Sequence, residues 1–123
     1  MRTITDHVAN PVNDRITITV LDEPGAGGAN HDYRIAGFDK HPRSATGMRI
    51  TFQNGPIGEA GVNGVTQEEL LAVVIDRLRS FQSGPFACTE NAVALAHAEQ
   101  ALDALKGRTR SRMARGVEGR TIA

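Results

Sequence analysis

Residues 66–85 read TQEELLAVVIDRLRSFQSGP, and they predict a helix that ends at a tight turn. Thr66 and Glu69 have the spacing of a capping box, in which two side chains satisfy backbone groups at a helix start. Apolar residues then recur at helical spacing and form one stripe: Leu70, Leu71, Val74, Ile75, Leu78 and Phe81. Pro85 prevents smooth continuation, so the segment predicts one helix with a single apolar face.

A second helix is expected to begin near Thr89 and Glu90. Its apolar face consists of Leu95, Ala98, Leu102 and Leu105, and many alanines allow close packing. We expect this helix to be interrupted near Gly107 or to end at Gly116. Because a short turn joins the two helices, they must run antiparallel, and residues 65–116 predict a helical hairpin.

Before the hairpin, three segments alternate in the manner of β-strands: residues 15–21, 31–38 and 48–53. The glycines of residues 24–30 supply turn geometry, so the first two strands are expected to pair as a hairpin. Residues 54–64 contain four glycines and a proline and are expected to be irregular. A connecting loop is the favoured interpretation, and a segment ordered against a ligand or partner is the alternative.

These elements predict an α+β fold in which a small antiparallel N-terminal sheet is followed by an antiparallel helical hairpin. We expect the 123 residues to form a single domain. It would comprise a loose arm (1–14), a β-rich part with the Gly-rich loop (15–64), the hairpin (65–116) and a tail (117–123). Small single-core domains are often only marginally stable, so self-association would help, and the fold is expected to be oligomeric.

The composition, 40% hydrophobic and 23% charged, is that of an ordinary globular protein. Apolar runs stay well below the roughly 18 residues of a membrane span, and the N-terminus lacks the apolar stretch of a signal peptide. Cys88 is the single cysteine, which suits a reducing cytosol. We expect Cys88 to be a small buried hydrophobic residue near a turn.

Catalysis is weakly supported by the sequence. The four histidines are scattered, and neither a metal-ligand spacing nor a nucleophile elbow is present. Asp76 and Glu90 are single acids on helices, and nothing requires them to act as a pair. We therefore expect no catalytic residue, no metal site and no cofactor.

Charge is unevenly distributed although the net charge is zero. Residues 1–102 contain eight Lys/Arg and twelve Asp/Glu, a net charge of −4, and residues 103–123 contain six and two, a net charge of +4. This asymmetry indicates that the C-terminal part meets an anion or the acidic surface of a neighbouring subunit. The zero total disfavours a protein that coats DNA.

The best-supported chemistry is anion binding. Arg108, Arg112 and Arg115 fall at i, i+4 and i+7 and share one helix face if the helix continues that far. Guanidinium groups suit phosphate oxygens because two parallel hydrogen bonds match their planar geometry. The alternative is a solvated basic face that complements the helix dipole. Phe81 either stacks on a base or closes the apolar stripe, and Asn91 either caps the second helix or contacts a ligand.

The spacing of these residues has a geometric consequence. Asn91 and Arg108 are seventeen residues apart, which corresponds to about 25 Å along a straight helix. Phe81 and Asn91 lie near the tip of the predicted hairpin, whereas Arg108 and Arg112 lie near its base. If all four bind one small molecule, the site must form between subunits, with the tip of one hairpin against the base of another.

Several short phrases occur together between Ile50 and Gly119: FQNGPI (52–57), GVNG (61–64), VIDRL (74–78), FQ (81–82), ENA (90–92), RT (108–109) and RGVEG (115–119). In combination they resemble the Thoeris anti-defence sponge family of phages, whose helical hairpin is similar to that of anti-CBASS sponges. The resemblance covers more than half of the chain, and the first 49 residues contribute little to it.

The resemblance implies a protein that binds a cyclic nucleotide signal tightly and does no chemistry on it. In the family, the signal is a cyclic ADP-ribose isomer made by a bacterial TIR-domain protein during infection, and its removal keeps the downstream effector silent. Members assemble as homo-oligomers, including hexamers, with pockets between subunits. Some also hold cyclic di- or trinucleotides at separate sites. The expected location is the cytoplasm of the infected bacterial host.

Site roles also follow from the resemblance. Phe81 is expected to stack on adenine, Asn91 to contact a ribose, and Arg108 and Arg112 to face the pyrophosphate. These roles agree with the interchain pocket that the spacing requires. Three alternatives are a nucleic-acid-binding module that uses the basic C-terminal helix, an enzyme that cleaves the signal, and a structural virion component.

Overall fold

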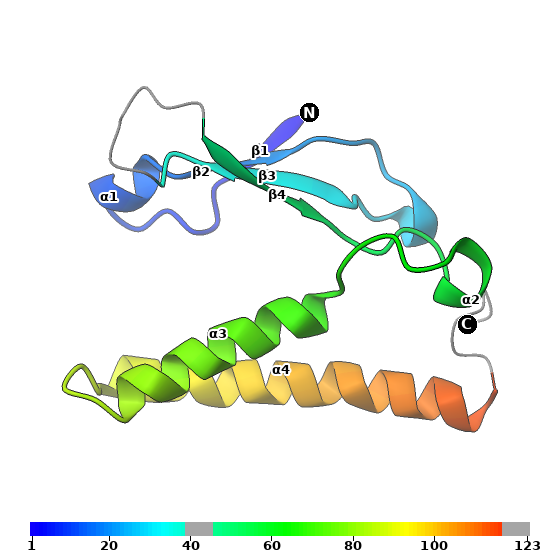
Figure 1. Ribbon diagram of the computed structural model, residues 1–123. Helices are drawn as coiled ribbons and strands as arrows, with labels where there is room; N and C mark the ends of the chain where they lie inside the picture. The colour runs from blue at the N-terminus through cyan, green and yellow to red at the C-terminus, as the bar shows by residue number, and fades with distance from the viewer. Residues whose placement is uncertain (39–45, 117–123) are drawn as a thin grey trace. The chain divides into compact units, whose positions relative to one another are not determined.

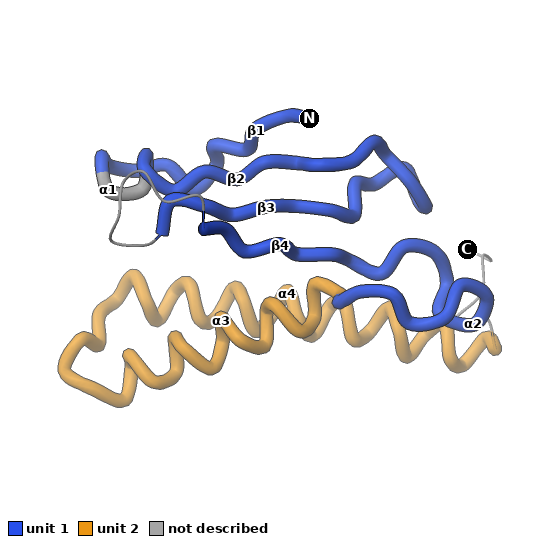
Figure 2. Tube along the Cα trace, turned by 45° about the horizontal axis from the view of Figure 1, so that its top comes forward, with its two compact units in different colours: residues 1–65 blue, residues 66–123 orange. Residues whose placement is uncertain are grey.

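The computed structural model describes residues 1–38 and 46–116, apart from the side chains of residues 12 and 13. The chain divides into two units, residues 1–65 and 66–123 (Figure 2). All described strands belong to the first unit and the two long helices to the second (Figure 1). The α+β class, with an antiparallel sheet followed by a helical hairpin, is confirmed. The predicted tail, residues 117–123, lies outside the described residues.

The sheet consists of four antiparallel strands in sequential order: β1 (Arg2–Ile4), β2 (Thr17–Val20), β3 (Asp32–Ala36) and β4 (Gly47–Thr51). The last three correspond to the predicted strands. Val20 is paired with Tyr33, and Asp32 is paired with Thr51. Among the described residues of this unit, Val20 and Ala36 are the buried apolar ones, so the sheet has a very small core.

The beginning of the chain is more regular than expected. Residues 1–14, predicted to be a loose arm, contain β1 and the one-turn helix α1 (Pro11–Asp14). Arg2 pairs with Val20 and Ile4 pairs with Ile18, so β2 supplies the backbone partners of β1. Three residues are too few to show a hydrophobic period, and the strand exists only through this pairing.

Asp22 organises the connection between β2 and β3. Its carboxylate accepts hydrogen bonds from the backbone N–H groups of His31, at 3.0 Å, and Asp32, at 3.3 Å. The bond from His31 is the main reason that the pKa of Asp22 lies below its usual value. Gly27 and Gly28 follow with φ of +72° and +78°, a conformation that favours glycine. The predicted Gly-rich turn is confirmed.

Side-chain amides order the Gly-rich segment after β4. Asn63 accepts a hydrogen bond from the backbone N–H of Asn54 and donates one to the Asn54 carbonyl, both at 2.8 Å. The side chain of Gln53 donates to the carbonyl of Gly61 at 2.7 Å. The segment, predicted to be irregular, also contains the one-turn helix α2 (Ile57–Ala60). Side chains of Gln53 and of the segment itself thus bond the backbone of this segment.

The predicted helical hairpin consists of α3 (Gln67–Gln82) and α4 (Thr89–Ala114), packed against each other (Figure 1). Ile75 is 3% exposed. The other residues predicted to face inward are half-buried, with one exception. The half-buried residues are Leu70, Leu71, Leu78, Phe81, Leu95, Ala98, Leu102 and Leu105. The exception is Val74, which is 47% exposed, because the seam between two helices is narrower than the predicted stripe.

Helix α4 continues through Gly107 without interruption and is followed by Gly116, whose φ is +71°. Of the two predicted possibilities, the ending near Gly116 is therefore the correct one. The prediction that Cys88 is buried is wrong. Cys88 is exposed and is the N-cap residue of α4, where its Sγ accepts a hydrogen bond from the backbone N–H of Asn91 at 3.4 Å. Capping directs the thiol to the helix end instead of the core.

The predicted capping box at the start of α3 is confirmed. The Glu69 carboxylate accepts hydrogen bonds from the Thr66 hydroxyl and, at 3.4 Å, from the Thr66 backbone N–H. The hydroxyl bond is the main reason that the pKa of Glu69 lies below its usual value. The carboxylate form thus stabilises the helix start above the pKa of an ordinary glutamate, and this contribution is lost as the pH falls through the lowered pKa.

We expect Thr66→Ala to lower the free energy of unfolding by about 1 kcal/mol at neutral pH, the usual cost of losing an N-cap. The difference in unfolding free energy from wild type should narrow as the pH falls below the pKa of an ordinary glutamate and through the lowered pKa of Glu69, because the carboxylate then becomes protonated. Urea unfolding at fixed protein concentration, followed by circular dichroism at neutral and acidic pH, measures the loss of unfolding free energy and its change with pH. Ser80→Ala is the matched control, because the Ser80 hydroxyl bonds only to the carbonyl of Asp76 within the same helix. Equal destabilisation by the two changes would contradict the capping role.

Candidate functional site

The turn between α3 and α4 brings together two predicted site residues. Phe81 lies in the last turn of α3, and Asn91 lies in the first turn of α4. Both line an open hollow of about 660 Å³, which we call the tip groove. The remaining residues that line it are Val74, Arg77, Leu78, Phe86 and Ala94. The hairpin tip therefore offers a mostly apolar concavity with a few polar groups, which is typical of small-molecule sites.

Aromatic and cationic groups surround the Phe81 ring. The ring of Phe86 meets it edge to face, with 6.5 Å between centroids and 81° between planes. The guanidinium carbon of Arg77 lies 5.0 Å from the Phe81 ring centroid, within the range of a cation–π interaction. Phe81 is half-buried, so it both joins the helix seam and presents part of its ring to the groove. Such a ring can stack on a planar base.

The side chain of Asn91 makes no hydrogen bond within the described residues, although its backbone N–H bonds to Cys88. Of the two predicted roles, the cap therefore belongs to Cys88. The Asn91 amide, half-buried at the wall of the tip groove, has one acceptor and two donor positions to offer. It can bond a hydroxyl group of a molecule that sits against Phe81.

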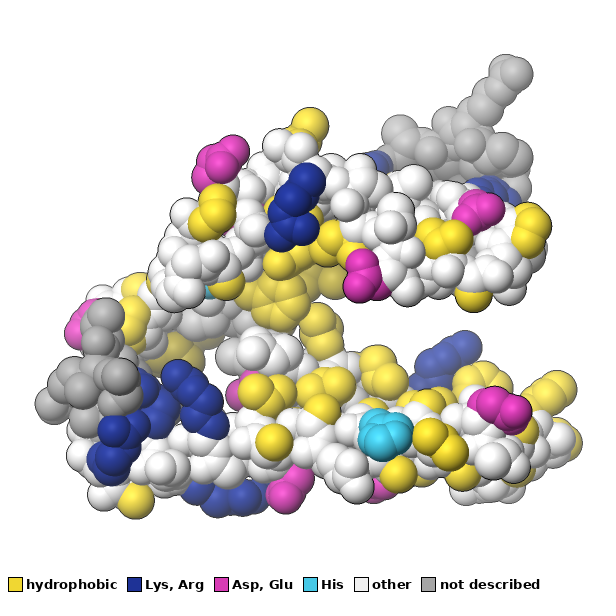
Figure 3. Space-filling view, turned by 180° about the vertical axis from the view of Figure 1, so that it is seen from behind, with side chains coloured by type: hydrophobic (Ala, Val, Ile, Leu, Met, Phe, Trp, Pro, Cys, Tyr) yellow, Lys and Arg dark blue, Asp and Glu magenta, His cyan; other side chains and the backbone are white. Residues whose placement is uncertain are grey.

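The structure places Arg108 and Arg112 at the other end of α4. Because the helix is unbroken, the seventeen-residue separation of Asn91 and Arg108 corresponds to about 25 Å. Arg108 is exposed, whereas Arg112 is buried, with 7% of its surface accessible. On the hairpin, Figure 3 shows basic side chains gathered toward the end of α4 and hydrophobic ones toward the turn. The four predicted residues thus form two pairs that one small molecule cannot span within one hairpin.

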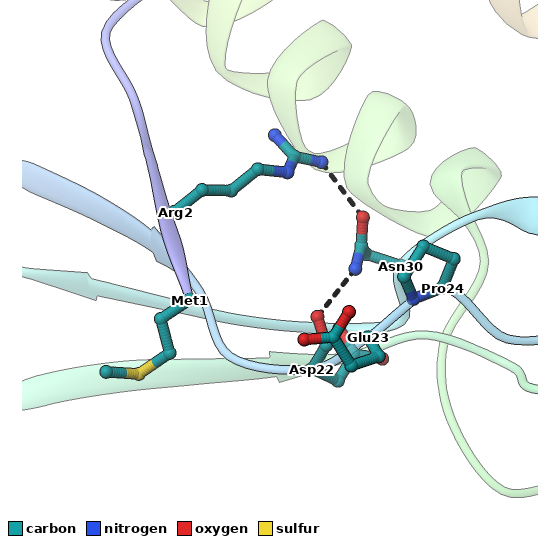
Figure 4. A pocket seen from close by; sticks show the side chains of 6 residues that line it. All are labelled: Met1, Arg2, Asp22, Glu23, Pro24 and Asn30. Atoms are coloured by element: carbon teal, nitrogen blue, oxygen red, sulfur yellow. Dashed lines mark hydrogen bonds between the residues drawn. The ribbon is translucent and has the colours of Figure 1, made fainter.

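Two hollows besides the tip groove are also candidate ligand sites. One, of about 510 Å³, adjoins it and is lined by Val73, Asp76, Arg77, Ser80 and Phe81. The other, of about 230 Å³, lies on the sheet unit (Figure 4). There the Arg2 guanidinium donates to Asn30 Oδ1 at 2.9 Å, and Asn30 Nδ2 donates to the Asp22 carbonyl at 2.7 Å. Because Arg2 and Asn30 are already engaged in these bonds, we assign no ligand to that hollow.

Neither a metal cluster nor a membrane-spanning helix occurs in the part of the chain that the structure describes. No group of three or more His, Cys, Asp or Glu residues there is close enough to hold a metal ion. No helix there combines the length and the apolar character needed to cross a bilayer.

Sequence reasoning missed Arg77, Phe86 and Val74 as lining residues of the tip groove. Arg77 precedes Phe81 by four residues, a spacing that places both on one helix face, so the signal was available for this residue. Phe86 lies in the turn between α3 and α4, where no helical or strand period indicates which way a side chain points. Val74 had been assigned to the core.

Fold and site define a small α+β protein whose helical hairpin carries all of the candidate ligand-binding residues. Residues 44–109, more than half of the chain, match the family described as "Acb2/Tad1, hairpin domain". The chain therefore belongs to this family.

A relative from Bacillus phage SBSphiJ7, named "Thoeris anti-defense 1", is 51% identical over 70 residues. The matched segment covers 57% of this chain and 49% of the relative. The chain thus matches about half the length of that relative.

The different burial of the two arginines leads to a prediction about stability. Arg112→Ala should lower the free energy of unfolding by about 1–3 kcal/mol, because it removes a buried side chain together with the packing of its aliphatic part. Arg108→Ala should change it by less than about 0.5 kcal/mol, as expected for an exposed side chain. Urea unfolding at matched protein concentration measures both values. Similar small effects would show that Arg112 is not buried in solution.

Proposed function

We propose that this protein binds and sequesters a cyclic ADP-ribose-type signalling nucleotide without cleaving it, as an anti-defence sponge of phages. The single observation that carries the proposal is the tip groove, in which Phe81 and Asn91 lie together on a hairpin of the Acb2/Tad1 family. The name of the similar phage protein, "Thoeris anti-defense 1", supports an anti-defence role.

In this proposal the tip groove holds the nucleoside. The adenine base stacks on the Phe81 ring, and the Asn91 amide bonds a ribose hydroxyl. Base–aromatic stacking is worth on the order of 1–3 kcal/mol where it has been measured for nucleic acids. The apolar walls formed by Val74, Leu78 and Ala94 exclude water from the stacked base.

The pyrophosphate is held by Arg108 and Arg112 of a second subunit. The separation of about 25 Å along α4 prevents these arginines from reaching the tip groove of their own hairpin. Arg108 is exposed and available to an anion. Arg112 is buried in the single chain, so its side chain must either turn outward to reach the anion or act indirectly by positioning Arg108. The pocket therefore requires an oligomer, with a hexamer as the expected assembly.

Two features of the hairpin support association. Large apolar side chains on both helices remain exposed in the single chain, among them Val73, Val93 and Met113. Gly107 lies beside Arg108 within α4, and a Cβ at this position would meet no atom within 4 Å outside its own helix turn. Nothing in the single chain requires glycine there, which fits a position where another molecule approaches the helix backbone.

Sequestration makes no demand for catalytic groups. It requires tight binding and enough sites to outnumber the signal molecules, and it gains nothing from turnover. The protein would act in the cytoplasm of the infected host, where the signal is made. Cyclic di- and trinucleotides are further proposed ligands, for which we assign no residues.

The proposal is tested by incubating purified protein with a cyclic ADP-ribose isomer, removing unbound ligand, denaturing the complex by heat and identifying the released molecule by mass. We expect intact ligand in stoichiometric amount. Phe81→Ala should weaken binding tenfold or more, given the energy of base stacking. Phe38→Ala is the matched control, because Phe38 is an exposed aromatic residue of the sheet unit. Arg108→Ala should also weaken binding, whereas Arg110→Ala should not.

Two other outcomes would contradict the proposal. Recovery of a cleaved product would indicate an enzyme. Absence of retained ligand, together with steeply salt-dependent binding of DNA or RNA, would favour the nucleic-acid-binding alternative.

A further inference from the structure

Arg77 is the one cationic side chain among the residues that line the tip groove, and it also lines the adjoining hollow of about 510 Å³. Phe81 also lines both hollows. The two residues are one helix turn apart on α3 and in contact through the cation–π interaction. Together they form the boundary between the hollows, so a molecule that enters either one meets both side chains.

The guanidinium group of Arg77 differs from those of three other described arginines, Arg49, Arg79 and Arg110, in having no acidic partner within the described residues. Arg49 is paired with Asp32, Arg79 is paired with Glu99 at 2.7 Å, and Arg110 lies 4.0 Å from Asp103. Arg77, by contrast, is exposed, and within the described residues it interacts with the Phe81 ring alone. All five of its N–H donors are therefore available to an anionic ligand.

We propose that Arg77 binds a phosphate of the nucleotide whose base stacks on Phe81, so that the tip groove recognises base and phosphate together. This inference rests on the proposed function and assigns a second chemical group of the ligand to the same groove. The cation–π contact of an exposed arginine is weak, whereas a hydrogen-bonded guanidinium–phosphate pair is among the stronger polar interactions. The flexible Arg77 side chain can thus leave the ring face to the base and turn to the phosphate.

The assignment changes how the pyrophosphate is held between two subunits. Arg77 contacts the phosphate nearer the stacked base from the tip of one hairpin. Arg108 of the neighbouring subunit contacts the other phosphate. Each hairpin tip then has some affinity for a mononucleotide by itself, and the neighbouring arginine adds to it.

AMP and adenosine, which differ by one phosphate, test this inference on the full chain. Each is titrated separately into wild type, Arg77→Gln and Arg79→Gln, and the dissociation constant is obtained from NMR chemical shifts. Arg79→Gln is the matched control, because it removes the same charge from the same helix at a residue that is paired with Glu99 and lies outside the groove.

We expect wild type to bind AMP about tenfold more tightly than adenosine, through a charge-assisted hydrogen bond. Arg77→Gln should bind adenosine as wild type does and lose the preference for AMP, whereas Arg79→Gln should keep it. An unchanged preference in Arg77→Gln, or no binding of AMP to wild type, would overturn the inference.

Failure of this inference can be distinguished from failure of the proposed function. Wild-type protein that retains a cyclic ADP-ribose isomer, combined with an unchanged AMP preference in Arg77→Gln, would refute the inference alone. Protein that binds AMP through Arg77 and does not retain the cyclic signal would refute the proposed function alone.

Discussion

The unbroken helix α4 is the constraint on which the account of this protein depends. Twenty-six residues, Thr89–Ala114, form one rod that begins at the Cys88 cap and passes Gly107 without a break. The rod fixes Asn91 near the turn and Arg108 near the opposite end, and no rearrangement within a continuous helix can bring the two together. Whatever molecule uses both ends must therefore be shared between two hairpins.

The packing of the hairpin is consistent with such sharing. The two helices meet along a narrow seam, and Ile75 is the one apolar residue of the described hairpin that is buried. An isolated pair of helices with so small a core is only marginally stable. Association would cover the apolar residues that the single chain leaves exposed, and it would complete the proposed pocket in the same step. Binding and assembly would then stabilise each other.

Local sequence signals predicted the parts of the fold that local interactions determine. The capping box at Thr66 and the 3.6-residue period of α3 and α4 identified the hairpin, and the alternation of three segments identified β2, β3 and β4. The strand β1 was missed because three residues carry no period and depend on pairing with β2.

Predicting the site from sequence was harder, because the groove depends on side-chain directions at a turn. The pairing of Phe81 with Asn91 could be expected from the hairpin topology. The burial of Arg112 could not, because it depends on tertiary contacts. The position of Arg77 over the Phe81 ring and the capping role of Cys88 are local, since they link residues four and three apart, and the prediction overlooked them. The choice of Phe81, Asn91, Arg108 and Arg112 as a set came from the family resemblance and stays a prediction.

The central claim, that the pocket combines the tip of one hairpin with the base of another, is tested most directly by mixing two inactive variants. Phe81→Ala and Arg108→Ala chains are unfolded together, refolded and assayed for retention of a cyclic ADP-ribose isomer. An intersubunit pocket predicts that random assembly restores about a quarter of the sites, those that combine an intact tip with an intact base. Each variant refolded alone should stay inactive. A mixture that binds no more ligand than the separate variants would contradict the claim.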